Sequence, residues 1–366
     1  MIKRRKLLSY ATTTAATSVA VNLASPAIQA QDKPTIRWKL TTSWPTSLDT
    51  LYGAAQTVAR RVKEMTDGRF TIQTFAAGEI VPGLEVMDAI QQGTVECGHT
   101  SSYYYIGKDP ALAFATAVPF GLNAQQQNAW LYQGGGNEAI NQVYSNFNII
   151  AFPAGNTGVQ MGGWFKREIN TLADLQGLKM RIPGLGGEIL SRLGVNVQVL
   201  PGGEIFLALE RGAIDAAEFV GPYDDEKLGL NKAAKFYYYP GWWEAGPTLH
   251  LLVNLKAWNN LPSEYQNILQ TAAVEANREC LAKYDARNPP ALQRLLQQGT
   301  QLREFSPEIL KAAEKMSFEL FQENAAKSLS FKSVYQSWKQ FRDSIYLWHS
   351  VSELGYSQFL IPDSVK

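Results

Sequence analysis

The sequence has few of the residues on which metal and thiol chemistry usually depends. It contains only two cysteines and three histidines, and the histidines lack metal-ligand spacing. No Cys-x-x-Cys, Gly-x-Ser-x-Gly or His-Glu-x-x-His motif occurs, so no catalytic nucleophile is predicted. Cys97 and Cys280 stand far apart in apolar or helical contexts, which favours two buried thiols over a disulfide bridge.

A strong charge of one sign and long apolar runs are also absent. The 366 residues include 34 Lys and Arg against 33 Asp and Glu, a formal net charge of +1. Nucleic acids and anionic membranes require a basic excess in their partners, so neither is expected to bind this protein. Residues 7–23 are only mildly apolar and fall short of the roughly twenty apolar residues that a membrane span needs.

Residues 1–30 have the pattern of an export signal. Basic residues 3–6 precede the mildly apolar segment, and Ala30 offers a small residue before a cleavage point. Arg4 and Arg5, followed by Lys6-Leu7-Leu8, resemble the twin-arginine signals that export folded proteins. No cysteine lies in this segment, so a lipid anchor is not expected. We therefore predict a soluble periplasmic protein, exported by the twin-arginine route.

Short β-rich runs alternate with segments of helical periodicity along much of the chain. In the first half, strands are expected over 36–42, 70–76, 98–102 and 149–153, and helices over 51–66 and 84–92. In the second half, strands are expected over 178–182, 195–199 and 213–220, and helices over 187–193 and 205–211. Such alternation predicts mostly parallel sheets covered by helices. Residues 89–96 and 208–215 share one local pattern, which indicates two similar α/β lobes facing one another.

Two carboxylates stand beside aromatic residues. Glu218 lies where an apolar run ends in a Gly-Pro turn, and Glu244 follows two tryptophans. An ionised carboxylate that leaves water needs a cation or a full set of hydrogen bonds, because its desolvation is costly. The pattern favours a bound metal ion or a cationic ligand, with ordinary surface carboxylates as the alternative.

Further residues are expected in a cleft between the lobes. Ligands of open α/β sheets bind beyond the carboxyl ends of the strands, and Arg181 and Tyr103 lie at such ends. Gln160 lies just past the first crossing between the lobes. The planar guanidinium of Arg181 suits bidentate capture of a carboxylate, with a solvated surface arginine as the alternative. His99 either lines the cleft or is a buried histidine with satisfied hydrogen bonds.

Four segments resemble those of the solute-binding proteins of TRAP (tripartite ATP-independent periplasmic) transporters, most closely the subgroup that binds α-keto acids. They are 158–165, 179–184, 218–229 and 237–250, and the similarity runs over nearly all of the mature chain. The resemblance implies a periplasmic binding protein-like α/β fold with a ligand cleft between two lobes and with C-terminal helices. It also implies capture of a 2-oxo or 2-hydroxy monocarboxylate, such as pyruvate, for delivery to the membrane permease subunits of the transporter.

The resemblance assigns roles to residues of the expected cleft, with Arg181 gripping the ligand carboxylate. The ligand-binding residues so implied are Arg181, Gln160, Tyr103, Glu218 and Trp243. The cation ligands so implied are Gln160, Glu218, the main-chain carbonyl of Phe219, and Glu244. The family member used for comparison has tryptophan in place of Phe219, a change that keeps the backbone ligand but reshapes the pocket wall.

The charges of this set favour a hard cation. Two glutamates and the ligand carboxylate face one arginine, so a net negative charge remains in a closed cleft. Oxygen donors suit Na⁺ or Ca²⁺ and disfavour zinc or copper. The alternatives are a TRAP binding protein for glutamate or a dicarboxylate, and an exported metal-dependent enzyme with Glu218 or Glu244 as its base. A binding protein needs neither base nor nucleophile, and we predict no enzymatic activity.

The C-terminal part of the chain is expected to be helical. Residues 224–227 (Asp-Asp-Glu-Lys) are interpreted as a helix start with a structural role. After residue 262 the chain reads as helices, and Pro289-Pro290 predict a break after a long one. The divisions are an export signal over 1–30, lobe I over 31–155, lobe II over 156–249, a helical segment over 250–330 that partly returns to lobe I, and a C-terminal helix over 331–366.

A helix expected from residue 331 to about 354 carries bulky apolar residues at three- and four-residue steps. They are Trp338, Phe341, Ile345 and Trp348. Such a stripe is buried either against the same chain or against a second copy. The α-keto acid subgroup includes dimers that exchange a C-terminal helix, so the resemblance implies a homodimer, with exchange of this helix as a further prediction.

Overall fold

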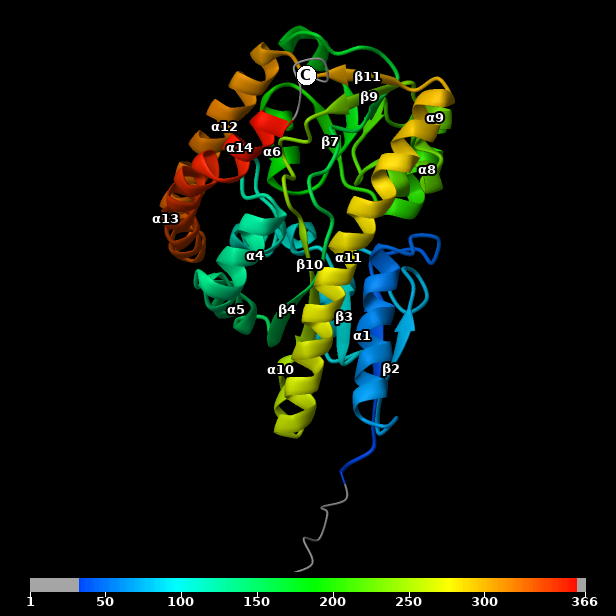
Figure 1. Cartoon of the computed structure of the whole chain (residues 1–366), viewed down its shortest axis with the longest axis vertical. Coiled ribbons are helices and arrows are strands. Elements are labelled where there is room, and N and C mark those ends of the chain that lie inside the picture. Colours follow the sequence, from blue (N-terminus) through cyan, green and yellow to red (C-terminus); the bar gives the residue numbers. More distant parts are fainter. Residues whose placement is uncertain (1–32, 361–366) are drawn as a thin grey trace, which may run out of the picture. The chain divides into compact units, whose positions relative to one another are not determined.

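Two mixed β-sheets organise residues 33–360, the part of the chain that the computed structural model describes (Figure 1). From Thr35 onwards the chain belongs to one compact unit. The predicted export signal over 1–30 lies outside the described residues. Within residues 33–360, every helix is too short or too polar to cross a membrane.

The first sheet combines strands from the N-terminal region with one strand that returns much later in the sequence. Its order is β2 (Phe70–Phe75), β1 (Ile36–Thr42), β3 (Cys97–Thr100), β10 (Thr248–Asn254) and β4 (Ile149–Asn156). Strand β1 is parallel to β2 and β3, whereas β10 lies antiparallel between β3 and β4. We call the part of the chain built on this sheet the first lobe.

The second sheet is formed by shorter strands. Its order is β11 (Gln301–Glu304), β9 (Phe236–Tyr239), β5 (Trp164–Phe165), β8 (Ala216–Ala217), β6 (Lys179–Arg181) and β7 (Asn196–Gln198). Strand β6 is parallel to β7 and β8, and β9 is parallel to β11, whereas β5 is antiparallel to both of its neighbours. The part of the chain built on this sheet is the second lobe.

Helices pack on both sheets and on one another (Figure 1). Helices α1 (Leu51–Met65) and α11 (Ser263–Gln297) contact the first sheet, and α6 (Gly184–Arg192) contacts the second. The other α-helices are α2 (Val86–Gln91), α3 (Ala113–Thr116), α4 (Ala124–Gln133), α5 (Gly136–Ser145), α7 (Ile205–Glu210), α8 (Pro222–Leu228), α9 (Leu230–Ala233), α10 (Leu255–Asn259), α12 (Pro307–Lys327), α13 (Leu329–Val351) and α14 (Glu353–Leu360). The 3-10 helices are η1 (Ser102–Tyr105), η2 (Pro110–Leu112), η3 (Leu172–Leu175) and η4 (Gly202–Glu204).

The predicted alternation of strands and helices is confirmed in both lobes, but the sheets are mixed rather than mostly parallel. Strand β10 was not predicted from the sequence. It enters the first sheet directly from the second lobe without a crossover helix, and an antiparallel orientation needs no such helix. The strand expected over 213–220 is much shorter, since only Ala216–Ala217 are paired.

The predicted break at Pro289-Pro290 is wrong, because α11 runs through both prolines. Each proline lacks an N–H group and deprives the carbonyl four residues earlier of its helical donor, at a cost of about 3 kcal/mol or more. Packing offsets this cost. Tyr284 before the prolines, and Ala291 and Leu295 after them, are all fully buried, so tertiary contacts hold both halves of α11 in line.

Both cysteines are free and buried, as predicted. Burial raises the pKa of the Cys97 thiol well above its ordinary value and that of Cys280 to about 12. Cys97 lies in β3 and Cys280 in α11. The thiols are therefore part of the packed interior and are unreactive as nucleophiles at neutral pH.

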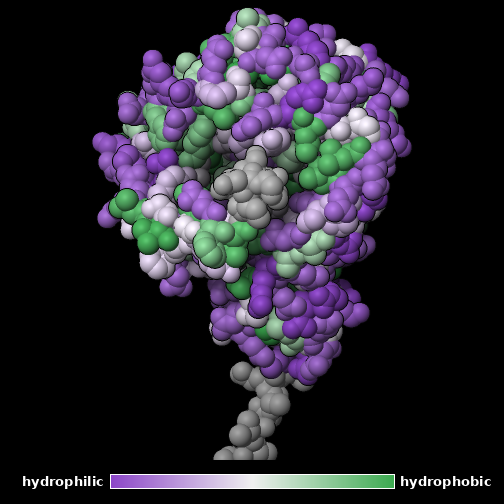
Figure 2. All heavy atoms as spheres, turned by 45° about the horizontal axis from the view of Figure 1, so that its top comes forward, coloured by the Kyte–Doolittle hydropathy of each residue, from purple (hydrophilic) through white to green (hydrophobic). Residues whose placement is uncertain are grey.

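The apolar stripe of the C-terminal region mostly covers its own chain. Trp338 is buried in the main core cluster, and Phe341 and Ile345 pack against that cluster. Trp348 is 62% exposed, so the stripe predicted from the sequence divides between a buried and an open part. Figure 2 shows one face of the molecule, on which hydrophobic side chains gather in separate patches among hydrophilic ones.

Candidate binding site

Arg181 is the last residue of β6, and its guanidinium is almost completely buried. Its Nη1 forms an ion pair with Glu218 Oε1 and donates to the Glu218 carbonyl at 2.9 Å. Its Nε donates to the Leu200 carbonyl at 3.0 Å. Among the described residues, Nη2 has no hydrogen-bond partner. One edge of a buried guanidinium is therefore available to a ligand.

Glu218 directly follows β8, the strand that pairs with β6, and this pairing places it beside Arg181. Its carboxyl is fully buried, and the described part of the chain provides no partner for Oε2. Burial raises the pKa of Glu218 to about 8, against the lowering effect of Arg181. Burial thus opposes ionisation here more strongly than the arginine favours it.

Glu244 supplies a second buried carboxyl from the segment that leads back to the first lobe. The hydroxyl of Tyr103, which lies in η1 just after β3, donates to Glu244 Oε2 at 3.5 Å. Burial, and then the charge of Glu218, raise the pKa of Glu244 well above its ordinary value. Burial and the charge of Glu244 likewise raise the pKa of Tyr103. Ionisation of either glutamate therefore disfavours ionisation of the other, and Tyr103 contacts Glu244 from the first lobe.

Gln160 presents a free amide oxygen in the same region. Its backbone N–H donates to the Glu244 carbonyl at 3.1 Å, and its Nε2 donates to Thr157 Oγ1 at 3.2 Å. Within residues 33–360, Oε1 of Gln160 has no hydrogen-bond donor. With Glu218 Oε2, this makes two buried oxygen acceptors that lack donors.

Phe219 and Trp243 form walls of this region. The Arg181 guanidinium lies over the Phe219 ring, 5.7 Å from its centroid. Trp243 is buried between Trp242 and Phe305. A Cβ atom at Gly186 would lie 2.8 Å from the Trp243 Cβ, so only glycine allows α6 to pack so closely on this tryptophan.

A cavity of about 280 Å³ lies beside the buried charges, between η1 and α6. Tyr103 is shared between the cavity wall and the carboxylate cluster. The other lining residues are Tyr104, Ile106, Ile182, Pro183, Gly184, Gly187, Glu188, Ser191, Val197 and Val199.

His99 does not line a binding site, and its alternative interpretation as a satisfied buried histidine is confirmed. Trp44 Nε1 donates to His99 Nδ1 at 2.8 Å, and His99 Nε2 lies 3.1 Å from the Ala154 carbonyl. Both contacts fit the tautomer with its proton on Nε2. Burial lowers the pKa of His99 to about 4, which keeps the ring neutral.

The donor set near Glu218 fits a hard cation. No group of three or more His, Cys, Asp or Glu side chains that could hold a metal ion occurs in residues 33–360. Carboxylate oxygens, amide oxygens and main-chain carbonyl oxygens are the ligands that Na⁺ and Ca²⁺ prefer. The site offers two carboxyls and one amide oxygen. A cation bound here would provide a partner for Gln160 Oε1 and for Glu218 Oε2. It would also reduce the repulsion between the two glutamates when both are ionised.

Sequence reasoning missed the depth at which Asp224 and Asp225 lie. Helix α8 does begin nearby, at Pro222, as predicted, and both carboxyls are buried. Asp224 accepts hydrogen bonds from Thr50 and Tyr284, and Asp225 from Trp164 and Tyr237. Thr50, Tyr284 and Trp164 are far from α8 in the sequence, so no local pattern could have revealed these donors.

The chain belongs to the bacterial extracellular solute-binding protein family 7, whose DctP family model matches residues 41–328. It is 66% identical over 361 residues to a monocarboxylate 2-oxoacid-binding periplasmic protein of Nostoc sp. (strain PCC 7120), a match that covers 98% of this chain and 99% of the relative. The predicted membership among the TRAP solute-binding proteins is thereby confirmed.

Solved structures of TRAP solute-binding proteins share the fold. One from Bordetella bronchiseptica, a mixed-occupancy dimer with copurified calcium and picolinate, has a TM-score of 0.88 and 48% identity, covering 89% of this chain and 97% of that one. One from Colwellia psychrerythraea, with calcium and pyruvate, has a TM-score of 0.86 and 39% identity, covering 89% and 100%. One from Pseudoalteromonas atlantica, with sodium and pyruvate, has a TM-score of 0.86 and 39% identity, covering 88% and 99%. The predicted two-lobed α/β fold with C-terminal helices is confirmed.

The buried carboxyls of α8 give stability a pH dependence. Burial raises the pKa of Asp224 and of Asp225 to about 6, from an ordinary value of 3.8. Because the folded pKa lies above the unfolded pKa, each contribution to the free energy of unfolding is present at low pH and is lost as pH rises from about 4 to about 6. We expect Asp224→Asn to become more stable relative to the wild type over this window.

Urea denaturation at intervals between about pH 4 and pH 7 measures this difference. Asp174→Asn is the control, because Asp174 is exposed and hydrogen bonds from the backbone of Asn170 and Thr171 lower its pKa. Its difference from the wild type should not rise over the same window. A pH-independent difference for Asp224→Asn contradicts the expectation.

Proposed function

We propose that this protein is the extracytoplasmic solute-binding component of a TRAP transporter, that it captures 2-oxo monocarboxylates such as pyruvate, and that it delivers them to the membrane permease. The observation that carries the proposal is the buried cluster of Arg181, Glu218 and Glu244, which holds two carboxyls and one guanidinium, and beside which several polar atoms lack partners within residues 33–360. The 66% identity to a 2-oxoacid-binding protein supports the choice of ligand.

In this proposal, Arg181 binds the carboxylate of the ligand. Its free Nη2 supplies a donor at the edge of a guanidinium that the protein already holds by three hydrogen bonds. Such fixed planar donors suit a carboxylate because little further ordering is needed on binding. Tyr103 and Trp243 complete the ligand site, together with Gln160 and Glu218.

Gln160, Glu218, Glu244 and the main-chain carbonyl of Phe219 would hold the cation. When bound, Na⁺ or Ca²⁺ supplies positive charge to a space with two carboxyls and an anionic ligand. The two oxygens that lack donors, Gln160 Oε1 and Glu218 Oε2, support this assignment. Proteins similar to this chain have been solved with calcium or with sodium beside pyruvate.

The cavity beside the cluster favours a monocarboxylate over glutamate or a dicarboxylate. Its lining, which lies within the described residues, includes several apolar side chains and no Lys or Arg. Glu188 in its wall is a carboxyl whose pKa is raised by burial. A second carboxylate placed there would find no cation of the protein and would face Glu188, whereas an acyl chain suits the apolar walls.

Membership of this family favours a binding protein over an enzyme. The alternative is an exported metal-dependent enzyme with Glu218 or Glu244 as its base, but this family consists of solute-binding proteins. We infer that the ligand is released unchanged, which NMR of pyruvate incubated with the protein tests directly.

We also propose export by the twin-arginine route through residues 1–30, and lobe divisions near residues 155, 249 and 330.

We further propose that the protein is a homodimer. Its C-terminal helices α13 and α14 expose large apolar side chains, and soluble monomers seldom leave such patches open. A dimer has been reported for the Bordetella bronchiseptica protein. Exchange of the C-terminal helix between subunits stays a prediction. The exposed side chains are Leu347, Trp348, Val351, Leu354, Tyr356, Phe359 and Leu360.

Loss of Arg181 should abolish tight binding. Arg181→Ala removes one side of a desolvated ion pair with the ligand, and we expect a loss on the order of 2 to 5 kcal/mol in the free energy of pyruvate binding. Arg181→Lys should not restore it, because the planar fork is lost. Isothermal titration calorimetry with calcium present measures the pyruvate affinity of both variants. Arg192→Ala, which breaks an exposed pair with Glu323, is the control and should bind normally; less than a threefold change in either Arg181 variant defeats the assignment.

Removal of cations should weaken binding. After treatment with chelator and exchange into sodium-free buffer, two buried glutamates would face the ligand carboxylate without positive charge beyond Arg181. We expect pyruvate affinity to fall markedly and to return on addition of Ca²⁺ or Na⁺. Glu244→Gln should bind with little dependence on cation, whereas Glu168→Gln, at an exposed pair with Arg303, should behave as the wild type. Unchanged affinity after exhaustive cation removal refutes the cation site.

Charge on the exposed face of α13 should dissociate the dimer. Leu347→Glu with Val351→Glu places two carboxylates where apolar side chains are now open, and we expect monomers by sedimentation equilibrium at micromolar concentration. Val274→Glu on α11, at another exposed valine, should leave the dimer intact. A wild-type protein that sediments as a single species at the monomer mass rules out the dimer.

A further inference from the structure

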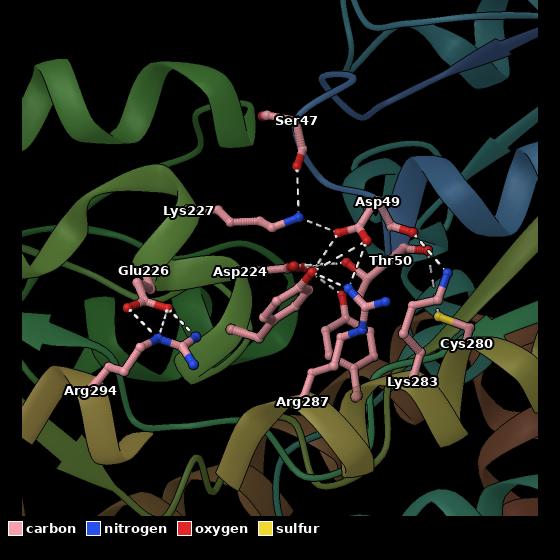
Figure 3. Close-up of polar contacts among 12 residues, drawn as sticks. Ser47, Asp49, Thr50, Asp224, Glu226, Lys227, Cys280, Lys283, Arg287 and Arg294 are labelled. Atoms are coloured by element: carbon pink, nitrogen blue, oxygen red, sulfur yellow. Dashed lines mark hydrogen bonds and ion pairs between the residues drawn. The ribbon is translucent and has the colours of Figure 1, made fainter. Parts of the chain in front are cut away.

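A polar cluster outside the binding site connects the segment before α1 with α8 and α11 (Figure 3). Asp49 forms an ion pair with Lys227 of α8 and accepts from Arg287 Nη1 of α11 at 3.0 Å. The Tyr223 hydroxyl donates to Asp49 Oδ1 at 3.1 Å, and Lys227 Nζ donates to the Ser47 carbonyl at 3.2 Å. Helix α8 of the second lobe is thus attached to the loop that precedes α1 of the first lobe.

A second attachment lies deeper in the same place. The Thr50 hydroxyl, just before α1, donates to Asp224 Oδ1 at 2.7 Å. The Tyr284 hydroxyl of α11 donates to Asp224 Oδ2 at 2.6 Å. Asp224 is completely buried, so these hydrogen bonds are shielded from water. Hydrogen bonds to a buried charged group are among the stronger ones in proteins.

The neighbouring residue, Asp225, holds α8 to the second lobe instead. Its Oδ2 accepts from Trp164 Nε1 at 2.9 Å and from the Tyr237 hydroxyl at 2.7 Å, and both donors lie in strands of the second sheet. Its Oδ1 accepts from the Val220 N–H at 3.2 Å. Val220 directly follows Glu218 and Phe219. The first turn of α8 is therefore fixed both to the proposed cation-binding segment and to the second sheet.

We propose that Asp49, Thr50, Asp224 and Lys227 are positioning residues, which tie α8 to the first lobe and so hold the Glu218–Phe219 segment in its ligand-binding arrangement. This inference rests on the proposed function. None of the four is a proposed ligand of solute or cation. They act by raising the fraction of molecules whose lobes are set for binding, and the apparent dissociation constant varies inversely with that fraction.

The tie can be weakened without touching the site. Lys227→Gln removes the ion pair with Asp49, whose side chains are 29% and 42% exposed. Arg294→Gln is the matched control, because it removes one positive charge from an ion pair between α11 and Glu226 of α8 and leaves the contact of α8 with Asp49 intact (Figure 3). Both variants change the net charge equally.

We expect Lys227→Gln to raise the dissociation constant for pyruvate, with calcium present, by about fivefold, the upper range for a partly exposed pair. Arg294→Gln should leave it unchanged, and Lys227→Arg, which keeps the charge, should restore most of the affinity. Thr50→Val, which is nearly isosteric and removes the donor to Asp224, should weaken binding in the same direction. Comparison of urea denaturation separates these effects from a general loss of stability.

Small-angle X-ray scattering of the ligand-free proteins provides a test that needs no ligand. Lys227→Gln and Thr50→Val should have a larger radius of gyration than Arg294→Gln and the wild type, because lobes released from the tie separate more often. If all four proteins scatter alike and bind pyruvate alike, the positioning role is wrong while the proposed function stands. If the wild type binds no 2-oxo acid, the proposed function fails, and the scattering alone decides whether the tie exists.

Discussion

The ion pair between Arg181 and Glu218 is shielded almost completely from water, and the rest of the site is arranged around it. Taking two charges out of water costs several kcal/mol each unless geometry and further hydrogen bonds compensate. The carbonyls of Leu200 and Glu218 provide part of that compensation on the arginine side. Glu244 then adds a second buried carboxyl, and burial raises the pKa of both glutamates. The site is thus stable enough to form but remains electrostatically incomplete.

Polar atoms that lack partners in the ligand-free site favour reversible binding of a solute and a cation. A site satisfied by its own side chains would have to exchange internal partners for the ligand and would gain little on binding. Among the described residues, one guanidinium nitrogen of Arg181, one carboxyl oxygen of Glu218 and the amide oxygen of Gln160 have no hydrogen-bond partner. A solute and a cation that arrive together bring charges of both signs, so each improves the site for the other. Coupling of this kind is reciprocal by thermodynamic necessity.

The positions of Arg181 and Glu218 at strand ends could be predicted because their signals are local. Arg181 ends a short strand before a glycine turn, and Glu218 ends an apolar run before Gly-Pro, so both could be placed at the carboxyl end of a sheet. The roles of Gln160, Phe219 and Glu244 came from family resemblance. The fold class followed from alternating periodicities, but the antiparallel entry of β10 did not, since a buried run of residues carries no sign of its direction.

The errors share a physical cause, which is that tertiary packing overrode a local rule. Pro289 and Pro290 disfavour a helix, yet α11 continues because buried side chains flank them. The acidic residues of α8 indicated only a helix start, whereas Asp224 is buried and accepts hydrogen bonds from Thr50 and Tyr284, both distant in the sequence. Trp348 shares the helical spacing of Trp338 but extends past the end of the core. None of these outcomes could be read from neighbouring residues alone.

The position of β10 has a consequence for how the chain can be made. Strands β3 and β4 pair with each other only through β10, so the first sheet is two separate pieces until residue 254 has been synthesised. By then the ribosome has already produced every strand of the second sheet except β11. The first sheet therefore cannot close until most strands of the second sheet have been made, and a gene cut before β10 would encode no intact first sheet.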